Sequence, residues 1–364
     1  MSKKGRVLMA MSGGIDSTIA SILLHEEGYE VIGITMKTWD YESVEVGKKE
    51  TGCCSLDSIN DARQVAVDFN FPHTILDIRN EFGDHIINNF VEEYIKGRTP
   101  NPCILCNTHI KWEALLKRAD ILQCDYIATG HYAQIRKENE RFVISQGLDL
   151  SKDQSYVLWG VSQECLKRTI FPMGKFYKKD IKQMAIDRGY LSLAKKSESY
   201  EICFIPDNDY RSFLKKRVPQ LENKVSGGDF ISLNGEKLGK HDGYPFYTVG
   251  QRKLGVSLGS KPSYVLEINS KTNTIVVGTK EDLKKQEVFI CDVNYMKYKH
   301  IEDGLQCLVK IRYKHKGEIA TITNEGNNLK ALFHKKVEGI APGQSAVLYE
   351  GNDLLAGGFI MKNE

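Results

Sequence analysis

Three cysteines in two short motifs are the first candidates for chemistry. Cys103 and Cys106 stand in N-P-C-I-L-C-N, between a proline turn and an expected helix that begins near Ile110. Cys203 lies much later in the chain, in S-E-S-Y-E-I-C-F-I-P. A position just before a helix can lower the pKa of a thiol, which would suit Cys106 to act as a nucleophile. From the residues alone, Cys103 and Cys106 fit a metal clip, a redox pair, a nucleophile with its neighbour, or two unrelated thiols.

A glycine-rich stretch near the amino terminus is the second candidate. In M-A-M-S-G-G-I-D-S-T, Ser12, Gly13 and Gly14 join an expected strand to an expected helix. Such a turn lets the backbone approach a phosphate and directs several N–H groups toward it. Asp16 and Ser17 fall in the first helical turn, where an aspartate is suited to hold Mg²⁺ and a serine to donate to a phosphate oxygen. The G-K-[ST] of a Walker loop is absent, so the motif itself places no lysine on the terminal phosphates.

The elements around the glycine-rich loop alternate between strand and helix patterns. Apolar strands separated by amphipathic helices predict a parallel sheet covered on both faces, which binds ligands beyond the carboxyl ends of its strands. The expected strands are 6–11, 30–36, 73–78 and 125–130, and the expected helices are 16–27, 56–69, 82–96 and 110–122. We expect mainly helix over residues 151–207.

After residue 207 the pattern changes to short strands broken by Gly, Asn and Asp. We predict strands in G-G-D-F-I-S-L, Y-P-F-Y-T-V, Y-V-L-E-I and T-I-V-V-G, followed at near-regular spacing by the segments from C-L-V-K-I-R-Y to L-A-G-G-F-I. Several short strands with turn residues between them predict a small barrel or sandwich.

The composition is typical of a soluble globular protein. A chain of 364 residues, with 41% apolar and 27% charged residues, predicts two or three ordinary domains. No apolar run reaches the ~18 residues needed to span a bilayer, and the first residues lack a signal-peptide cleavage site. Nine cysteines in this context indicate thiols, metal ligands or catalytic groups rather than structural disulfides. We therefore predict a cytoplasmic protein with no membrane partner.

Positive charge is concentrated in one stretch. The net charge of +3 does not by itself indicate a polyanionic partner, but residues 164–217 carry 13 Lys and Arg against 7 Asp and Glu. Such a run is usually a solvated face, and a nucleic-acid-binding surface is the alternative.

A series of sequence blocks resembles one family, the tRNA-specific 2-thiouridylases (MnmA). In chain order the blocks are S-G-G-I-D-S, G-R-T-P-N-P-C-I-L-C-N, A-T-G-H-Y-A, K-D-Q-S-Y-V-L, S-x-x-I-C-F-I, H-x-G-x-x-x-Y-T-V-G-Q-R-K, K-I-R-Y and A-P-G-Q-x-A-V-L-Y. The first block alone resembles the pyrophosphatase loop (PP-loop) of the adenine-nucleotide hydrolase superfamily, which also includes amide ligases and argininosuccinate synthase. The whole series covers nearly the entire chain.

The resemblance implies an α/β fold in three parts. The first, over residues 1–206, is a parallel-sheet, adenine-nucleotide hydrolase-like catalytic domain with a basic helical tRNA-binding part. A small central β-rich domain follows over 207–280, and a C-terminal β-barrel over 281–364.

The resemblance also implies a reaction, the ATP-dependent 2-thiolation of the wobble uridine in tRNAs for Lys, Glu and Gln. ATP, with Mg²⁺, adenylates the C2 oxygen of the uridine. A persulfide on Cys203 then delivers sulfur, and Cys106 completes the transfer and is left in a disulfide. The implied partners are tRNA and a persulfide donor such as a cysteine desulfurase or a sulfur-relay protein.

Further site residues carry over from the family one by one. Those that match ATP contacts are Ala10, Met11, Ser12, Gly13, Gly14, Ile15, Asp16, Ser17, Met36 and Gly130, the last two on the adenosine side. Those that match contacts to tRNA or to the target base are Asn101, Pro102, Cys103, His131, Lys152, Asp153, Gln154, Arg312, Tyr313 and Gln344.

Cys103 departs from the family pattern. The best-known form of the motif is N-P-D-x-x-C, and this chain has a thiol in place of that carboxylate. The change creates C-x-x-C together with a distant Cys203, the ligand set of related thiolases that hold a [4Fe–4S] cluster with three cysteines. Three thiolates suit such a cluster. Either Cys103 is a spectator beside a persulfide pair, or Cys103, Cys106 and Cys203 bind iron.

Two functions of other classes share some of these features. An amide or C–N ligase would use the same ATP loop but would leave both cysteine motifs unexplained. A non-enzymatic RNA-binding module with structural zinc would need a fourth ligand, such as His109 or His131, and would leave the ATP loop idle.

Overall fold

The computed structural model describes residues 4–38, 55–196, 202–205, 207–259 and 261–362. Two compact units divide the chain. Unit 1 comprises Met1–Ile86, Cys103–Asn208 and Asn352–Leu354, and unit 2 comprises Ile87–Pro102, Asp209–Gly351 and Leu355–Glu364. Among the residues described, no helix is both long enough and apolar enough to cross a membrane.

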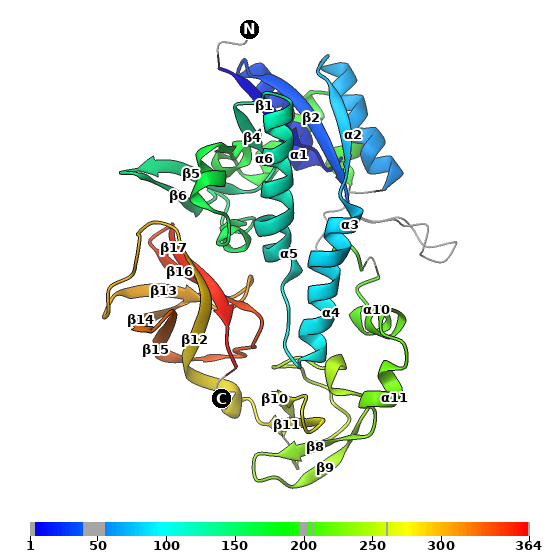
Figure 1. Ribbon diagram of the computed structural model, residues 1–364, viewed down its shortest axis with the longest axis vertical. Coiled ribbons are helices and arrows are strands. Elements are labelled where there is room, and N and C mark those ends of the chain that lie inside the picture. Colours follow the sequence, from blue (N-terminus) through cyan, green and yellow to red (C-terminus); the bar gives the residue numbers. More distant parts are fainter. Residues whose placement is uncertain (1–3, 39–54, 197–201, 206, 260, 363–364) are drawn as a thin grey trace. The chain divides into compact units, whose positions relative to one another are not determined.

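A five-stranded parallel sheet forms the centre of unit 1, as predicted (Figure 1). Its strand order is β3-β2-β1-β4-β7. The strands are β1 (Arg6–Ala10), β2 (Glu30–Lys37), β3 (His73–Asp77), β4 (Tyr126–Ala128) and β7 (Thr169–Ile170). The edge strand β7 lies in the region for which we expected mainly helix, and its two residues are too short a pattern to read from sequence.

Helices cover this sheet and fix the place of the glycine-rich loop. The helices of unit 1 are α1 (Ile15–Glu26), α2 (Leu56–Asp68), α3 (Arg79–Phe82), α5 (Pro102–Leu105), α6 (Trp112–Ile121), α7 (Gln163–Lys167), α8 (Lys178–Asp187) and α9 (Leu191–Lys195). Val7 and Met9 of β1 are buried in one core with Ile19 and Ile22 of α1 and Ile181 of α8. Each such side chain contributes roughly 1.5–3 kcal/mol on burial, so the core holds α1 and α8 firmly beside the end of β1.

Two of the expected helices contain π-helical turns. The segment predicted as 82–96 consists of α3, a π turn (Gly83–Ile87) and α4 (Asn88–Ile95). The segment before α6 consists of α5 and a π turn, Cys106–Lys111. Cys106 therefore begins a π-helical turn inside a helical run that starts at Pro102, so the expected helix start near Ile110, with Cys106 just before it, is wrong. Single π turns inside helices are frequent at functional sites.

An antiparallel hairpin in unit 1 was not predicted. Strands β5 (Ala133–Glu138) and β6 (Arg141–Gln146) pair along their whole length. Asn139 forms their turn with a φ of 53°, a left-handed conformation that asparagine tolerates better than most residues. The polar stretch K-E-N-E-R hides the strand alternation on either side of the turn.

Unit 2 contains a four-stranded sheet with the order β10-β11-β8-β9. The elements are α4, α10 (Tyr210–Arg217), α11 (Leu221–Val225), β8 (Gly228–Ser232), β9 (Lys237–His241), β10 (Tyr264–Asn269) and β11 (Thr274–Gly278). The predicted strand in Y-P-F-Y-T-V is wrong, because Tyr244–Phe246 forms a 3₁₀ turn. Pro245 has no N–H to donate to a strand ladder, which disfavours a strand there.

The carboxyl-terminal barrel confirms the second part of the fold prediction (Figure 1). Its strands are β12 (Lys284–Tyr295), β13 (Gln306–Lys310), β14 (Glu318–Glu325), β15 (Asn328–Glu338), β16 (Ser345–Glu350) and β17 (Asp353–Ile360). Pairing of β12 with β17 closes the barrel. Leu329, Ala331 and Phe333 alternate into its core along β15, with Lys330 and Leu332 between them less buried.

Candidate nucleotide and sulfur-transfer site

A glycine loop connects β1 to α1 and is held closely against α2. Gly13 has a φ of 66°, and a Cβ at this residue would lie 1.9 Å from the backbone oxygen of Ser58. Only glycine satisfies both the left-handed backbone and the close approach. Thr18 N–H donates to Gly14 O at 3.1 Å and starts the helical ladder.

Two serine hydroxyls shape the same loop. Ser17 Oγ accepts from Ser12 N at 3.1 Å, lies 3.2 Å from Ser12 Oγ and donates to Gly14 O at 3.1 Å. Gly14 caps α1 without a side-chain hydrogen bond. The first N–H groups of the helix therefore have no capping side chain, and they form a site suited to an anion. These features fit a bound phosphate chain.

The residues predicted to contact adenosine lie at the carboxyl ends of the two strands that flank β1. Met36 is near the end of β2, and Gly130 follows β4. A Cβ at Gly130 would lie 3.0 Å from Ser17 N, so this glycine packs on the first turn of α1. Met11 is buried, and its carbonyl accepts from Thr35 Oγ1 at 2.9 Å. The structure thus gathers most of the predicted ATP residues at the carboxyl edge of the sheet, where ligands bind in such folds.

Asp16 has two partners that the sequence did not indicate. Lys178 Nζ lies 2.7 Å from both carboxylate oxygens, and Tyr132 OH donates to Asp16 Oδ1 at 2.7 Å. Each carboxylate oxygen keeps acceptor capacity beyond these bonds, so Asp16 still fits a role as a Mg²⁺ ligand. Lys196 reaches the other side of the loop, with its Nζ 3.5 Å from Gly13 O.

His131 is held as a neutral imidazole. Its Nδ1 lies 2.8 Å from Thr129 Oγ1, and its ring lies 5.6 Å from the ring of Trp112. Desolvation, with a smaller effect of the Lys111 charge, lowers the pKa of His131 to about 3. The ring is therefore uncharged at pH 7 and cannot form an ion pair with a tRNA phosphate.

The two motif cysteines of N-P-C-I-L-C-N differ in exposure. Cys103 is exposed on α5, and Cys106 is buried at the start of the π turn. Surrounding protein raises the pKa of the Cys103 thiol by desolvation, against the opposing charge of Lys111. Cys203 is exposed. In the described part of the chain, no disulfide joins these residues, and no three Cys, His, Asp or Glu side chains are grouped to hold a metal ion.

The remaining described cysteines have the environments of structural thiols. Burial raises the pKa of Cys124 to about 11 and that of Cys307 to about 12, and desolvation also raises the pKa of Cys165 and Cys291. These thiols are protonated at neutral pH and are poor nucleophiles. Cys53 and Cys54 lie outside the described residues.

The K-D-Q segment is mostly committed to internal hydrogen bonds. Asp153 is 6% exposed, and its carboxylate accepts from Gln146 Nε2, Gly147 N, and both the N and Oγ of Ser155. Gln154 Oε1 accepts from Tyr132 N at 3.0 Å. Lys152 is partly exposed. Asp153 and Gln154 thus organise the loop beside Tyr132, and Lys152 is the member of the segment best placed for an outside contact.

Three of the predicted tRNA residues of unit 2, Arg312, Tyr313 and Gln344, lie in loops of the barrel. Arg312 and Tyr313 follow β13, where Arg312 Nη1 donates to Glu338 O and Tyr313 is 42% exposed. Gln344 Nε2 donates to the carbonyls of Thr99 and Pro100. Asn101 is partly exposed and Pro102 is buried.

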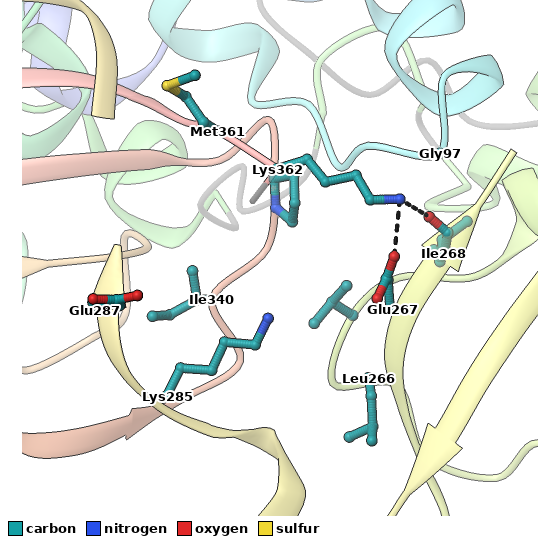
Figure 2. Close-up of a pocket in the computed structure, with 11 residues that line it drawn as sticks. Gly97, Leu266, Glu267, Ile268, Lys285, Glu287, Ile340, Met361 and Lys362 are labelled. Atoms are coloured by element: carbon teal, nitrogen blue, oxygen red, sulfur yellow. Dashed lines mark hydrogen bonds and ion pairs between the residues drawn. The ribbon is translucent and has the colours of Figure 1, made fainter. Parts of the chain in front are cut away.

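A cavity of about 120 Å³ in unit 2 is separate from these motifs (Figure 2). Lys362 Nζ lies there, 3.0 Å from Glu267 Oε1 and 3.1 Å from Ile268 O. None of its lining residues is among those predicted for ATP, tRNA or sulfur transfer.

Three family descriptions match the chain in succession. Residues 5–207 match the family described as tRNA methyl transferase HUP domain, 211–279 its PRC-barrel domain, and 285–360 an aminomethyltransferase beta-barrel domain. The tRNA-specific 2-thiouridylase MnmA of Cytophaga hutchinsonii is 59% identical over 99% of this chain and 98% of its own. The chain belongs to the MnmA family. The proteins of the same name from Amoebophilus asiaticus and Salinibacter ruber are 59% and 54% identical, over 98% and 99% of this chain and 96% and 95% of theirs.

A solved complex of a 4-thiouridine synthetase with RNA and ATP is a more distant match. It aligns at a TM-score of 0.37 and 17% identity, over 60% of this chain and 51% of that chain. So remote a likeness adds nothing to the MnmA assignment.

Proposed function

We propose that this MnmA-family protein uses ATP to replace the C2 oxygen of a tRNA uridine with sulfur, and that its target is the wobble uridine of tRNAs for Lys, Glu and Gln. The observation that carries the proposal is the presence of the glycine loop, Cys106 and Cys203 in one compact unit. High identity to 2-thiouridylases supports it.

The first step is activation of the uridine. Its C2 oxygen attacks the α-phosphate of ATP, forming an O–P bond, while the bond to the departing pyrophosphate breaks and N3 releases its proton. Oxygen on a pyrimidine is a poor leaving group until it becomes a phosphate ester. The backbone N–H groups at Gly14 and the first turn of α1 stabilise the phosphates, and Asp16 is the candidate ligand for Mg²⁺, which would offset their charge.

Sulfur transfer follows at the adenylated base. The outer sulfur of a Cys203 persulfide attacks C2, and the C2–O bond breaks to release AMP. The Cys106 thiolate then attacks Cys203 Sγ, and the bond between Cys203 Sγ and the sulfur on C2 breaks. The base is released as 2-thiouridine, and a Cys106–Cys203 disulfide remains. A thiol reductant resets the disulfide, and a persulfide donor such as a cysteine desulfurase or relay protein reloads Cys203.

Cys103 is a spectator in this mechanism. Its raised pKa keeps the thiol protonated, which supports that role. The alternative is a [4Fe–4S] cluster on Cys103, Cys106 and Cys203, and the described side chains are not grouped as such a ligand set. Anaerobic purification with iron and acid-labile sulfide analysis tests the cluster, and full thiolation by iron-free protein would exclude it.

We propose that the chain works in three parts: residues 1–206 for catalysis, 207–280 as a central domain and 281–364 as a barrel. Side chains at the surface support tRNA contacts in each of them. Lys152 is partly exposed, and Tyr313 and the basic end of α10, with Lys215, Lys216 and Arg217, are exposed. Phosphate contacts of this kind would make tRNA affinity fall steeply with added salt.

Pyrophosphate release tests the reaction class. With ATP, release that requires unmodified tRNA supports thiolation, and release that requires an amine instead supports an amide ligase. Mass spectrometry of the nucleosides identifies the product. Pyrophosphate release together with unchanged tRNA would reject the proposed function.

A further inference from the structure

Lys178 places a buried charge at the nucleotide loop. Its side chain is 8% exposed, and its Nζ lies 2.7 Å from both oxygens of Asp16. Burying an ammonium group is costly unless the charge is paired, and Asp16 provides that pairing. Lys178 is the first residue of α8, so its side chain reaches α1 from a distant part of the sequence.

Three contacts hold Lys178 beside the first turn of α1. Its backbone N–H donates to Asp149 Oδ2 at 3.0 Å, its ammonium bonds Asp16, and Nζ lies 5.7 Å from the ring centre of Tyr132. Tyr132 also donates to Asp16 through its hydroxyl. The ammonium is therefore preorganised beside the first turn of α1, and little side-chain entropy remains to be lost when a ligand arrives.

The glycine loop itself lacks a cation. No Lys or Arg occurs between Met9 and Thr18. A triphosphate carries several negative charges, and backbone N–H groups supply only partial positive charge. A charged donor adds a stronger hydrogen bond than a neutral one. Lys178 brings a full positive charge to Asp16, which lies in that same helical turn.

We infer that Lys178 binds the β- and γ-phosphates of ATP and the pyrophosphate that leaves, doing from α8 what a Walker loop does with a lysine in its own motif. The inference rests on the proposed use of ATP. Asp16 holds the ammonium in place in the absence of nucleotide. When ATP binds, the ammonium exchanges part of its present hydrogen bonding for phosphate oxygens, while Asp16 continues to hold it beside the loop.

Calorimetric titration of the full chain with α,β-methylene-ATP tests this inference, because that analogue is not cleaved between the α and β phosphates. AMP serves as the ligand without β- and γ-phosphates. We expect Lys178→Met to weaken analogue binding at least about tenfold and AMP binding less than about threefold, both with and without Mg²⁺. Lys178→Arg should restore most of the affinity.

Two further variants separate phosphate binding from a purely structural ion pair. Lys178→Gln keeps a donor toward Asp16 without the charge, and it decides the question if Lys178→Met does not fold. Lys297→Met is the matched control, because Lys297 is 12% exposed and lies 2.7 Å from Glu350 in the barrel. It should bind both ligands as wild type does.

Equal losses for the analogue and AMP, or unchanged analogue affinity in Lys178→Gln, would overturn the inference. The titration uses neither tRNA nor a sulfur donor. A failure of wild type to thiolate tRNA would therefore reject the proposed function without touching the result for Lys178.

Discussion

Gln344 in the barrel is hydrogen-bonded to the chain just ahead of the N-P-C-I-L-C motif. Its Nε2 donates to Thr99 O at 3.0 Å and to Pro100 O at 3.1 Å, and Thr99 N donates to Pro342 O at 2.8 Å. The family resemblance assigns Gln344 to tRNA contact. In this structure its amide nitrogen is hydrogen-bonded within the protein, to the segment that leads into Cys103 and Cys106.

We predict that Gln344→Ala lowers the single-turnover rate of thiolation about tenfold at saturating tRNA, because the loop loses two hydrogen bonds. Gln344→Glu should be worse, since a carboxylate faces two carbonyl oxygens. Gln286→Ala is the control, because that barrel side chain also donates to a carbonyl, Phe333 O. A change in tRNA affinity alone, with a normal rate at saturation, would show that Gln344 only contacts tRNA.

Gly13→Ala should damage both stability and nucleotide binding. The new Cβ would meet Ser58 O at 1.9 Å in a backbone with φ of 66°. We expect the free energy of unfolding to fall by ~2–3 kcal/mol and analogue binding to weaken more than tenfold. Gly28→Ala is the control, because Gly28 has a φ of 92° and an added Cβ there would meet no atom within 4 Å, and it should cost about 1 kcal/mol. If urea denaturation gave the same loss of stability for Gly13→Ala and Gly28→Ala, the close contact between Gly13 and Ser58 of α2 would be contradicted.

His131 should make stability depend on pH. Its pKa is about 3 in the folded protein, against about 6.5 when unfolded, so the unfolded chain binds the proton more tightly. The stabilisation that comes from keeping His131 neutral is complete above pH 6.5 and is lost as the pH falls toward 3. Over that range the loss lowers the free energy of unfolding by up to ~1.4 kcal/mol per pH unit. Urea denaturation at pH 7, 5.5 and 4.5 measures this effect. Between pH 7 and pH 4.5, the free energy of unfolding should fall less in His131→Asn than in wild type. The exposed His109 provides the control variant, His109→Asn, and an unchanged acid slope in His131→Asn would refute the prediction.

Substitution of Asp153 should lower the stability of the fold more than it lowers tRNA affinity. Its buried carboxylate accepts hydrogen bonds from Gln146, Gly147 and Ser155, so Asp153→Asn should lower the free energy of unfolding by ~2–3 kcal/mol. Lys152→Ala should leave stability within about 0.5 kcal/mol and weaken tRNA binding instead. Denaturation and filter binding measure the two effects, and the reverse pattern would show that Asp153 faces tRNA.

The sequence was sufficient for the features that depend on local pattern. Alternating strand and helix periods predicted the parallel sheet, and the glycine-rich motif predicted the tight loop between β1 and α1. Gly13 is an example, because its left-handed backbone is a local property. The barrel followed from repeated short strands with turn residues between them.

Features that depend on distant contacts were not predictable from the sequence. Asp16 and Lys178 are 162 residues apart, and no motif spacing links them. The Gln344–Thr99 bond spans 245 residues, so only the structure reveals its role in holding the loop. The two-residue strand β7 and the hairpin β5–β6 were missed because their patterns are too short or too polar.

The most direct measurement is the mass of the nucleosides after a single turnover on tRNA that lacks 2-thiouridine, with ATP and a cysteine desulfurase as the persulfide source. We predict that wild type and Cys103→Ser form 2-thiouridine, and that Cys203→Ser forms none while it still releases pyrophosphate in a tRNA-dependent way. In Cys106→Ser the reaction should stop after sulfur has reached C2, with that sulfur still bonded to Cys203 of the protein. Normal 2-thiouridine formation by Cys203→Ser would contradict sulfur transfer through this residue.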